Sequence, residues 1–244
     1  MSKNNHNFFY PLVFPFYQKK WLSRTWWLNL IAIIPIVDLI IFTGWRRKLI
    51  RNMAYNEEHI LPKAELLSFF KHGIILWIVA TLFLIIPMIL IFTVGSGAGG
   101  SIIEFGSWFV GLVTQDPNTI STKEMLASQG NDFIIRVLIE IVWALVSIPI
   151  LSTGLMRYAI TEKIGTLFNL PVNTMYAIKY IGPHFMMWIF KFFLIIFVAV
   201  VTSLLISSVV LAILAPMFAL SIYYWSTGYE FGHLAEKIKM DMER

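Results

Sequence analysis

Cysteine is absent from this sequence. Without a thiol, the chain can form no disulfide and can supply no thiolate ligand to zinc or to an iron–sulfur cluster. A cysteine nucleophile is excluded for the same reason. The sequence therefore carries no sign of the redox state of its compartment.

Charged residues are scarce. Only 14% of the 244 residues are charged, 58% are hydrophobic and the mean hydropathy is +0.73. A soluble domain has about a quarter of its residues charged, because its exterior must meet water. The excess apolar surface must face lipid, so we expect an all-α integral membrane protein. The net charge of +5 fits basic loops beside anionic membrane lipids, and we expect no nucleic-acid partner.

Patterns that carry catalytic chemistry are lacking as well. The sequence holds no paired carboxylates in one apolar segment, no serine or threonine with a recognisable histidine base, and no HExxH motif. The glycine-rich run Gly95–Ser101 lacks the Lys-Ser or Lys-Thr ending of a phosphate loop. We therefore expect a protein that is not an enzyme, with no metal site and no cofactor.

Long uncharged runs predict where the chain crosses the membrane. Crossing the hydrocarbon core takes about 20 apolar residues. The run between Lys191 and Glu230 is too long for one crossing and must fold back near Ser207 and Ser208. We expect four spans, at residues 72–94, 133–156, 187–206 and 209–229, with an external loop at 95–131.

The first hydrophobic segment, residues 26–45, is apolar enough to cross but contains Pro35 and Asp38 near its centre. An ionisable group at the midplane costs at least about 3 kcal/mol, and a central proline breaks the helix beside it. Basic residues flank the segment on both sides, which indicates that both flanks are cytoplasmic. We expect a re-entrant, broken helical hairpin here; a fifth span is the alternative.

The remaining segments follow from this arrangement. Residues 1–25 lack the continuous apolar region of a secretory signal and form a cytoplasmic interfacial segment. Residues 26–230 form the membrane domain, and residues 231–244 form a cytoplasmic tail. Both termini then face the cytoplasm, from an inner or intracytoplasmic cell membrane. Amphipathic helices at the interface, such as the short stretch Ile102–Val113, complete the expected fold.

Four stretches, in this order, resemble a known prokaryotic membrane family. They are IIPIVDLIIFTGWRRKLIRN (Ile33–Asn52), the pair Leu61–Pro62 ahead of a span, YAITEKIGTLFN (Tyr158–Asn169) and STGYEFGHLAEK (Ser226–Lys237). The family is catalogued as domain of unknown function 4013. The resemblance implies a multi-pass membrane protein without an assigned activity. One departure is Asp38, because the family usually carries asparagine there.

Ionisable residues within the expected membrane segments are candidates for transport. Asp38 beside Pro35 would offer a proton or cation site, although its simpler role is to cap the second half of the broken helix. Arg136 and Glu140 are spaced i,i+4 on one helical face, so they either neutralise each other at the membrane edge or couple to transport. We favour the structural roles.

His72 and His184 lie where spans begin on the inner side, and either imidazole would be able to ligate the metal of a haem or chlorophyll. Neither has a second partner that the sequence reveals, so ligation is the less favoured reading. A basic cluster is expected to contact lipid headgroup phosphates, with about 1 kcal/mol from each base. Its members are Arg46, Arg47, Lys48 and Arg51.

The composition favours one function. The chain has 20 Phe, 9 Trp and 9 Tyr, with few polar residues at membrane depth. Such a protein has large apolar faces for lipids and other integral membrane subunits, and little to conduct an ion. We expect an accessory or scaffolding subunit of a larger membrane complex, for example a respiratory or photosynthetic one. The alternative is a small-solute or ion transporter or channel built around the broken helix 26–45.

Overall fold

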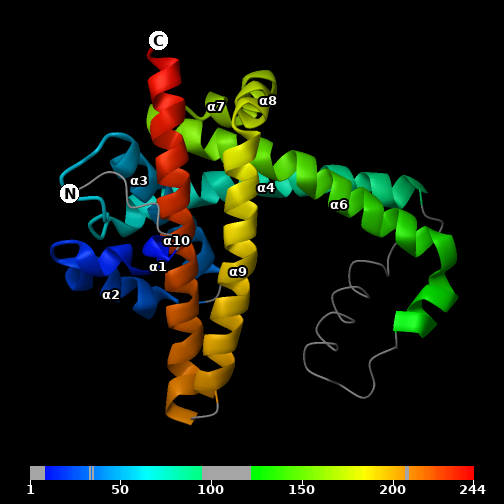
Figure 1. Ribbon diagram of the computed structural model, residues 1–244, viewed down its shortest axis with the longest axis horizontal. Coiled ribbons are helices and arrows are strands. Elements are labelled where there is room, and N and C mark those ends of the chain that lie inside the picture. Colours follow the sequence, from blue (N-terminus) through cyan, green and yellow to red (C-terminus); the bar gives the residue numbers. More distant parts are fainter. Residues whose placement is uncertain (1–8, 33, 35, 95–121, 207–208) are drawn as a thin grey trace. The chain divides into compact units, whose positions relative to one another are not determined.

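The computed structural model describes residues 9–32, 34, 36–94, 122–206 and 209–244, and of residues 88, 90–94, 122–137, 205–206 and 209–217 only the backbone (Figure 1). Within these ranges the chain forms helices and no strand, which confirms the all-α expectation. The elements are α1 (Tyr10–Val13), the 3-10 helix η1 (Phe14–Tyr17), α2 (Trp21–Ile31), α3 (Val37–Ala54), α4 (Leu66–Val94), α6 (Thr122–Thr161), α7 (Gly165–Phe168), α8 (Leu170–Lys179), α9 (Ile181–Ile206) and α10 (Val209–Met242).

The chain divides into two compact units. One contains Met1–Val79 and Pro149–Arg244, and the other is Ala80–Ile148. The second unit holds the later part of α4 and the earlier part of α6, and within it the indole Nε1 of Trp143 donates to the carbonyl oxygen of Phe83 at 3.1 Å. All the sites described below lie in the first unit unless stated.

Among the described residues, three helical segments are long and apolar enough to cross a membrane: Leu66–Pro87, Leu138–Thr161 and Ile181–Leu204. They correspond to the first three of the four expected spans, so the membrane character of the chain is supported. The fourth expected span, residues 209–229, falls in α10, where only residues from 218 onward have described side chains. That span stays a prediction. The fold-back at Ser207 and Ser208 lies outside the described residues, although α9 and α10 lie side by side on either side of it (Figure 1).

The break expected in segment 26–45 is present. Helix α2 ends at Ile31 and α3 begins at Val37, and between them Ile36 has a φ of 73°, which a branched residue seldom adopts. The two helices contact each other, and both pack on Phe69 of α4: the ring of Trp27 stacks on that of Phe69 with the centroids 5.8 Å apart, and Gly44 lies against the Phe69 backbone. That this hairpin enters a membrane and returns stays a prediction.

Helix α3 is held closely by its neighbours at glycines. A Cβ added to Gly44 would overlap the carbonyl oxygen of Phe69, and a Cβ added to Gly73 would overlap that of Ile40. On the opposite side, Gly228 and Gly232 of α10 are spaced i,i+4 and contact α3. Small residues at this spacing let two helix backbones approach, as in membrane helix pairs.

The core around α3 is largely aromatic. Buried side chains from α2, α3, α4 and α10 pack there with η1 and the loop before α4, and most are large rings. Burial of one such ring contributes roughly 1.5–3 kcal/mol relative to exposure to water. This core fixes α3 at the centre of the first unit. Its largest members are Phe14, Trp27, Phe42, Trp45, Phe69, Tyr224 and Trp225.

Candidate functional site

A cluster of polar side chains joins α3, α4 and the end of α6; we call it the Arg47 cluster. Its members are Arg47 and Arg51 of α3, His72 of α4, and Tyr158 and Glu162 at the end of α6. Nη2 of Arg47 donates to Oε1 of Glu162 at 2.6 Å, and Arg51 pairs with the same oxygen. Arg47 is only 2% exposed, and the carboxylate of Glu162 neutralises its charge.

The aromatic ring of Tyr158 extends this cluster to α4. The guanidinium carbon of Arg47 lies 4.9 Å from the ring centroid of Tyr158, a cation–π distance. The hydroxyl of Tyr158 lies 2.5 Å from Nδ1 of His72. The cluster therefore ties three helices together through one buried arginine.

The two arginines of the cluster change the pKa of the Glu162 carboxyl. The hydrogen bond from Arg51, followed by that from Arg47, lowers the pKa of Glu162 to about 2, against the opposing effect of burial. A carboxylate shared by two guanidinium groups is strongly held in its charged form. At neutral pH Glu162 is therefore ionised and forms an ion pair with both arginines.

A second polar group surrounds Arg157, one turn before the end of α6. Nη1 of Arg157 donates to Oδ1 of Asn173 at 2.6 Å. Nδ2 of Asn173 donates in turn to the carbonyl oxygens of Thr166, at 2.9 Å, and Leu167, at 3.2 Å. Helix α8, which carries Asn173, begins where the side chain of Asn169 accepts from the backbone N–H of Val172 at 3.3 Å. This group fastens the α7–α8 connection to α6.

Both histidines singled out in the sequence contact hydroxyl groups. His72 contacts Tyr158 as described, and the Nε2 of buried His184 lies 3.1 Å from Oγ1 of Thr153. Each ring thus has one nitrogen in use within the protein. Ligation of a haem or chlorophyll by either residue stays a prediction.

Asp38 lies in the first turn of α3 and is 5% exposed. Its Oδ1 accepts from the backbone N–H of Leu39 at 2.6 Å. A carboxylate in the first turn is stabilised by the unpaired N–H groups and the dipole of the helix. This geometry supports the structural role, although Asp38 lies one position inside α3 and not at its cap. The side chain of Arg136 lies outside the described residues, so its pairing with Glu140 stays a prediction.

The basic cluster of α3 divides into residues with different surroundings. Arg47 is buried in its ion pair and Arg51, 28% exposed, shares the same carboxylate. Arg46 lies over the rings of Tyr224 and Phe231, and Lys48 is partly exposed. Contact with lipid headgroups stays a prediction for the cluster, and the burial of Arg47 leaves it the least suited of the four.

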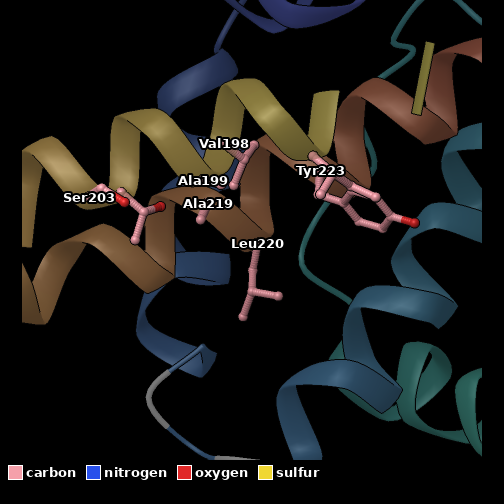
Figure 2. Close-up of a pocket in the computed structure, with 8 residues that line it drawn as sticks. Val198, Ala199, Ser203, Ala219, Leu220 and Tyr223 are labelled. Carbon is pink, nitrogen blue, oxygen red and sulfur yellow. The ribbon is translucent and has the colours of Figure 1, made fainter. Parts of the chain in front are cut away.

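A groove of about 440 Å³ lies between α9 and α10. Figure 2 shows Val198, Ala199 and Ser203 of α9 facing the segment of α10 that carries Ala219 and Tyr223. The groove is apolar except for a few hydroxyl groups, and small side chains form part of its wall. Its lining residues are Ile195, Val198, Ala199, Thr202, Ser203, Ala219, Leu220 and Tyr223.

Sequence reasoning missed the Arg47 cluster as a unit. It identified Arg47, Arg51 and His72 separately, and it gave Tyr158 and Glu162 only as part of a family resemblance. The partners are 86 and 115 residues apart in the chain, so no local pattern connects them. The one available signal was that two of the family-like stretches supply most of the cluster. In the part of the chain that the structure describes, no group of three histidine, aspartate or glutamate residues is placed to hold a metal ion.

Comparison with known proteins gives one match. The model of a family described as "Protein of unknown function (DUF4013)" matches residues 27–207, from α2 to the end of α9. This range contains the whole Arg47 cluster. No curated protein and no solved structure matches the chain.

Proposed function

We propose, from the premise that this chain belongs to the DUF4013 family of proteins of unknown function, that it is a non-enzymatic accessory or scaffolding subunit of a larger membrane protein complex. It packs laterally against other integral membrane subunits, with lipid around the rest. Its membrane is the inner or an intracytoplasmic cell membrane, and both termini face the cytoplasm.

The observation that carries this proposal is how little of each candidate span the chain covers by itself. Within an apolar 18-residue stretch of each span, between 17% and 33% of the residues are buried within the chain. Helix α9 buries His184, Met187, Phe190 and Leu194, and many of its other large apolar side chains are exposed. The exposed large side chains of α9 include Phe185, Met186, Phe192, Phe193, Ile196, Phe197, Val200 and Leu204.

The groove between α9 and α10 favours a protein neighbour over lipid at one place on this surface. Ala199 and Ala219 allow a third helix to approach closely, and the hydroxyls of Thr202 and Ser203 can hydrogen-bond across a helix interface. Lipid tails can fill such a groove but cannot satisfy hydroxyl groups. A transmembrane helix with a small or polar face fits it better.

The polar groups around Arg47 and Arg157 favour a structural role over transport. Arg47 pairs with the half-exposed Glu162, and Arg157 and Asn173 bond to each other and to the backbone. They fasten helices together and offer no open chain of polar groups through the described part of the protein. Helices joined by polar contacts, with apolar side chains on their outer surfaces, suit a subunit that holds other membrane subunits in place.

Co-purification tests the proposal. The full chain is extracted from its native membrane in a mild detergent, and the companion chains are identified by mass spectrometry. We expect a defined set of integral membrane proteins. Ala199→Phe, which fills the groove, should deplete one of them several-fold, whereas Ala80→Phe at an exposed position of α4 should not. A monomer or homodimer without companions contradicts the proposal.

A second candidate function, a small-solute or ion transporter, is supported by one observation. Buried Asp38 lies directly after the break between α2 and α3, where helix ends and carbonyl groups meet. Flux through liposomes that contain the purified protein tests this function. Asp38→Asn should abolish the flux if Asp38 carries a proton or cation; equal flux in both proteins, or none in either, ends this alternative.

A further inference from the structure

We propose that Arg46 and Lys191, which both lie over the ring of Phe231, form a binding site for a phosphate ester. This inference is independent of the proposed function, because it concerns a small anionic ligand and not a protein neighbour. Arg46 of α3 and Lys191 of α9 both reach Phe231 of α10, the helix that packs against α3 and α9 (Figure 1).

Two cations share one aromatic ring at this site. Nζ of Lys191 lies 4.5 Å from the ring centroid of Phe231. The guanidinium carbon of Arg46 lies 5.6 Å from the same centroid and 5.1 Å from that of Tyr224. The faces of these rings attract cations, so they hold both head groups in place. They do not neutralise the two charges.

Counter-charges are missing here but present at the neighbouring bases. Arg47 and Arg51 share Glu162, Lys179 pairs with Asp241, and Lys239 pairs with Glu243. Among the described residues, no carboxylate forms an ion pair with Arg46 or Lys191. Glu230, the residue before Phe231, forms an ion pair with neither.

Arg46 also has an unsatisfied donor. Its Nε, like those of Arg47 and Arg157, is buried without a hydrogen-bond partner among the described residues, but Arg47 and Arg157 are bound at another guanidinium nitrogen. A buried donor of a charged group without a partner is costly, and a cation inside an apolar span requires a counter-charge. Lys191 lies within the candidate span Ile181–Leu204. Together, the unpaired donor and the two like charges point to an anion that completes the site.

Phosphate chemistry fits this arrangement. The planar guanidinium of an arginine can donate to two phosphate oxygens at once, and a lysine ammonium adds a point charge beside it. Two sources share this chemistry: the headgroup of an anionic lipid and a free phosphate. The exposed phenyl rings of Phe192 and Phe193, next to Lys191 in the chain, provide a surface for acyl chains. We therefore assign the site to a lipid phosphodiester.

Lipid retention measures the binding. The full chain is purified in detergent, titrated with phosphatidylglycerol or phosphatidylcholine, and the bound lipid is counted by native mass spectrometry. We expect a clear preference for phosphatidylglycerol. Arg46→Gln and Lys191→Gln should each weaken that binding about fivefold, the effect of one base near an anionic surface.

Matched variants separate this site from general basicity and from misfolding. Lys63→Gln removes one positive charge from an exposed position in the loop between α3 and α4 and should leave the preference unchanged. Lys191→Arg keeps the charge and should retain binding. A parallel titration with inorganic phosphate, followed by thermal stability, identifies the source: stabilisation of the wild type that Lys191→Gln abolishes would support a free phosphate as ligand. If neither ligand binds the wild type more tightly than Lys191→Gln, or if Lys63→Gln loses as much, the site does not exist.

Discussion

Glu162 joins two arginines of α3 to the end of α6. It is 47% exposed, yet it supplies the counter-charge of Arg47, which is almost fully buried. A buried arginine deprived of its partner retains the whole cost of desolvation. The importance of Glu162 therefore comes from what it neutralises and not from its own burial.

The first prediction concerns Glu162→Gln. We expect it to lower the free energy of unfolding by about 2 kcal/mol, below the 3–5 typical of fully buried pairs because Glu162 is half exposed. Thermal unfolding in detergent, followed by circular dichroism, measures the loss. Glu58→Gln removes an acid from an exposed position and serves as the control. Equal melting of the two variants would show that Arg47 finds another partner.

The same substitution has a defined pH dependence. The pKa of Glu162 in the folded protein is about 2, below the ordinary value of 4.5. Its contribution to stability is therefore complete above about pH 4.5 and is lost as the pH falls towards 2. The difference in melting temperature between wild type and Glu162→Gln should be constant from pH 5 to 8 and shrink in more acidic buffer.

At the scale of the elements, α3 approaches its neighbours unusually closely. It contacts α4 at two glycines: the backbone of α4 leaves no room for a side chain at Gly44 of α3, and the backbone of α3 leaves none at Gly73 of α4. These two helices carry Arg47 and His72 of the Arg47 cluster, so the close approach of α3 and α4 fixes the spacing between two of its members.

The second prediction concerns Gly44→Ala. The added methyl group would overlap the backbone of Phe69, which cannot move aside as a flexible side chain can. We expect a loss of about 3 kcal/mol or more, or a failure to accumulate as folded protein. Gly182→Ala is the control, because a Cβ there meets nothing within 4 Å and alanine favours a helix. The yield and the melting temperature of the two variants are measured side by side. Equal values would contradict the close contact between Gly44 and the backbone of Phe69.

Helices and helix breaks could be predicted from the sequence where neighbouring residues alone determine them. Apolar runs gave three candidate spans, because hydropathy over 20 residues needs no knowledge of the fold. Pro35 and Asp38 predicted the break before α3 for the same reason. The start of α4 at Leu66, six residues before the expected span at His72, was missed, because Lys71 and His72 can reach polar surroundings from inside a helix.

The candidate site was predictable only in its parts. The bond between Arg47 and Glu162 joins residues 115 positions apart, and the contact between His72 and Tyr158 joins residues 86 apart. Such pairings arise from helix packing, which depends on where glycines such as Gly44 permit contact. A single glycine in an apolar run does not reveal its partner. The basic cluster was therefore expected to face lipid as one group, whereas its members have different surroundings.

At the scale of the whole molecule, the position of the N-terminal hairpin decides the topology. Nη1 of Arg24, in α2, donates to the carbonyl oxygen of Leu61, in the loop after α3, at 2.5 Å. A membrane crossing between these residues would separate them by roughly the 30 Å of the hydrocarbon core. Their direct contact argues against a simple crossing between them, and entry of the hairpin into the membrane stays a prediction.

The last prediction follows from this contact and uses the absence of cysteine. Lys19 and Glu57 are exposed residues on the two sides of the hairpin. Single cysteines in their place should react with a membrane-impermeant maleimide from the same side, the cytoplasmic one, as should Glu243→Cys in the tail. Asn118→Cys, in the loop expected to be external, is the opposite control. Labelling of Lys19→Cys and Glu57→Cys from opposite sides would require the Arg24–Leu61 bond to be broken in the membrane, and five spans would then replace the re-entrant hairpin.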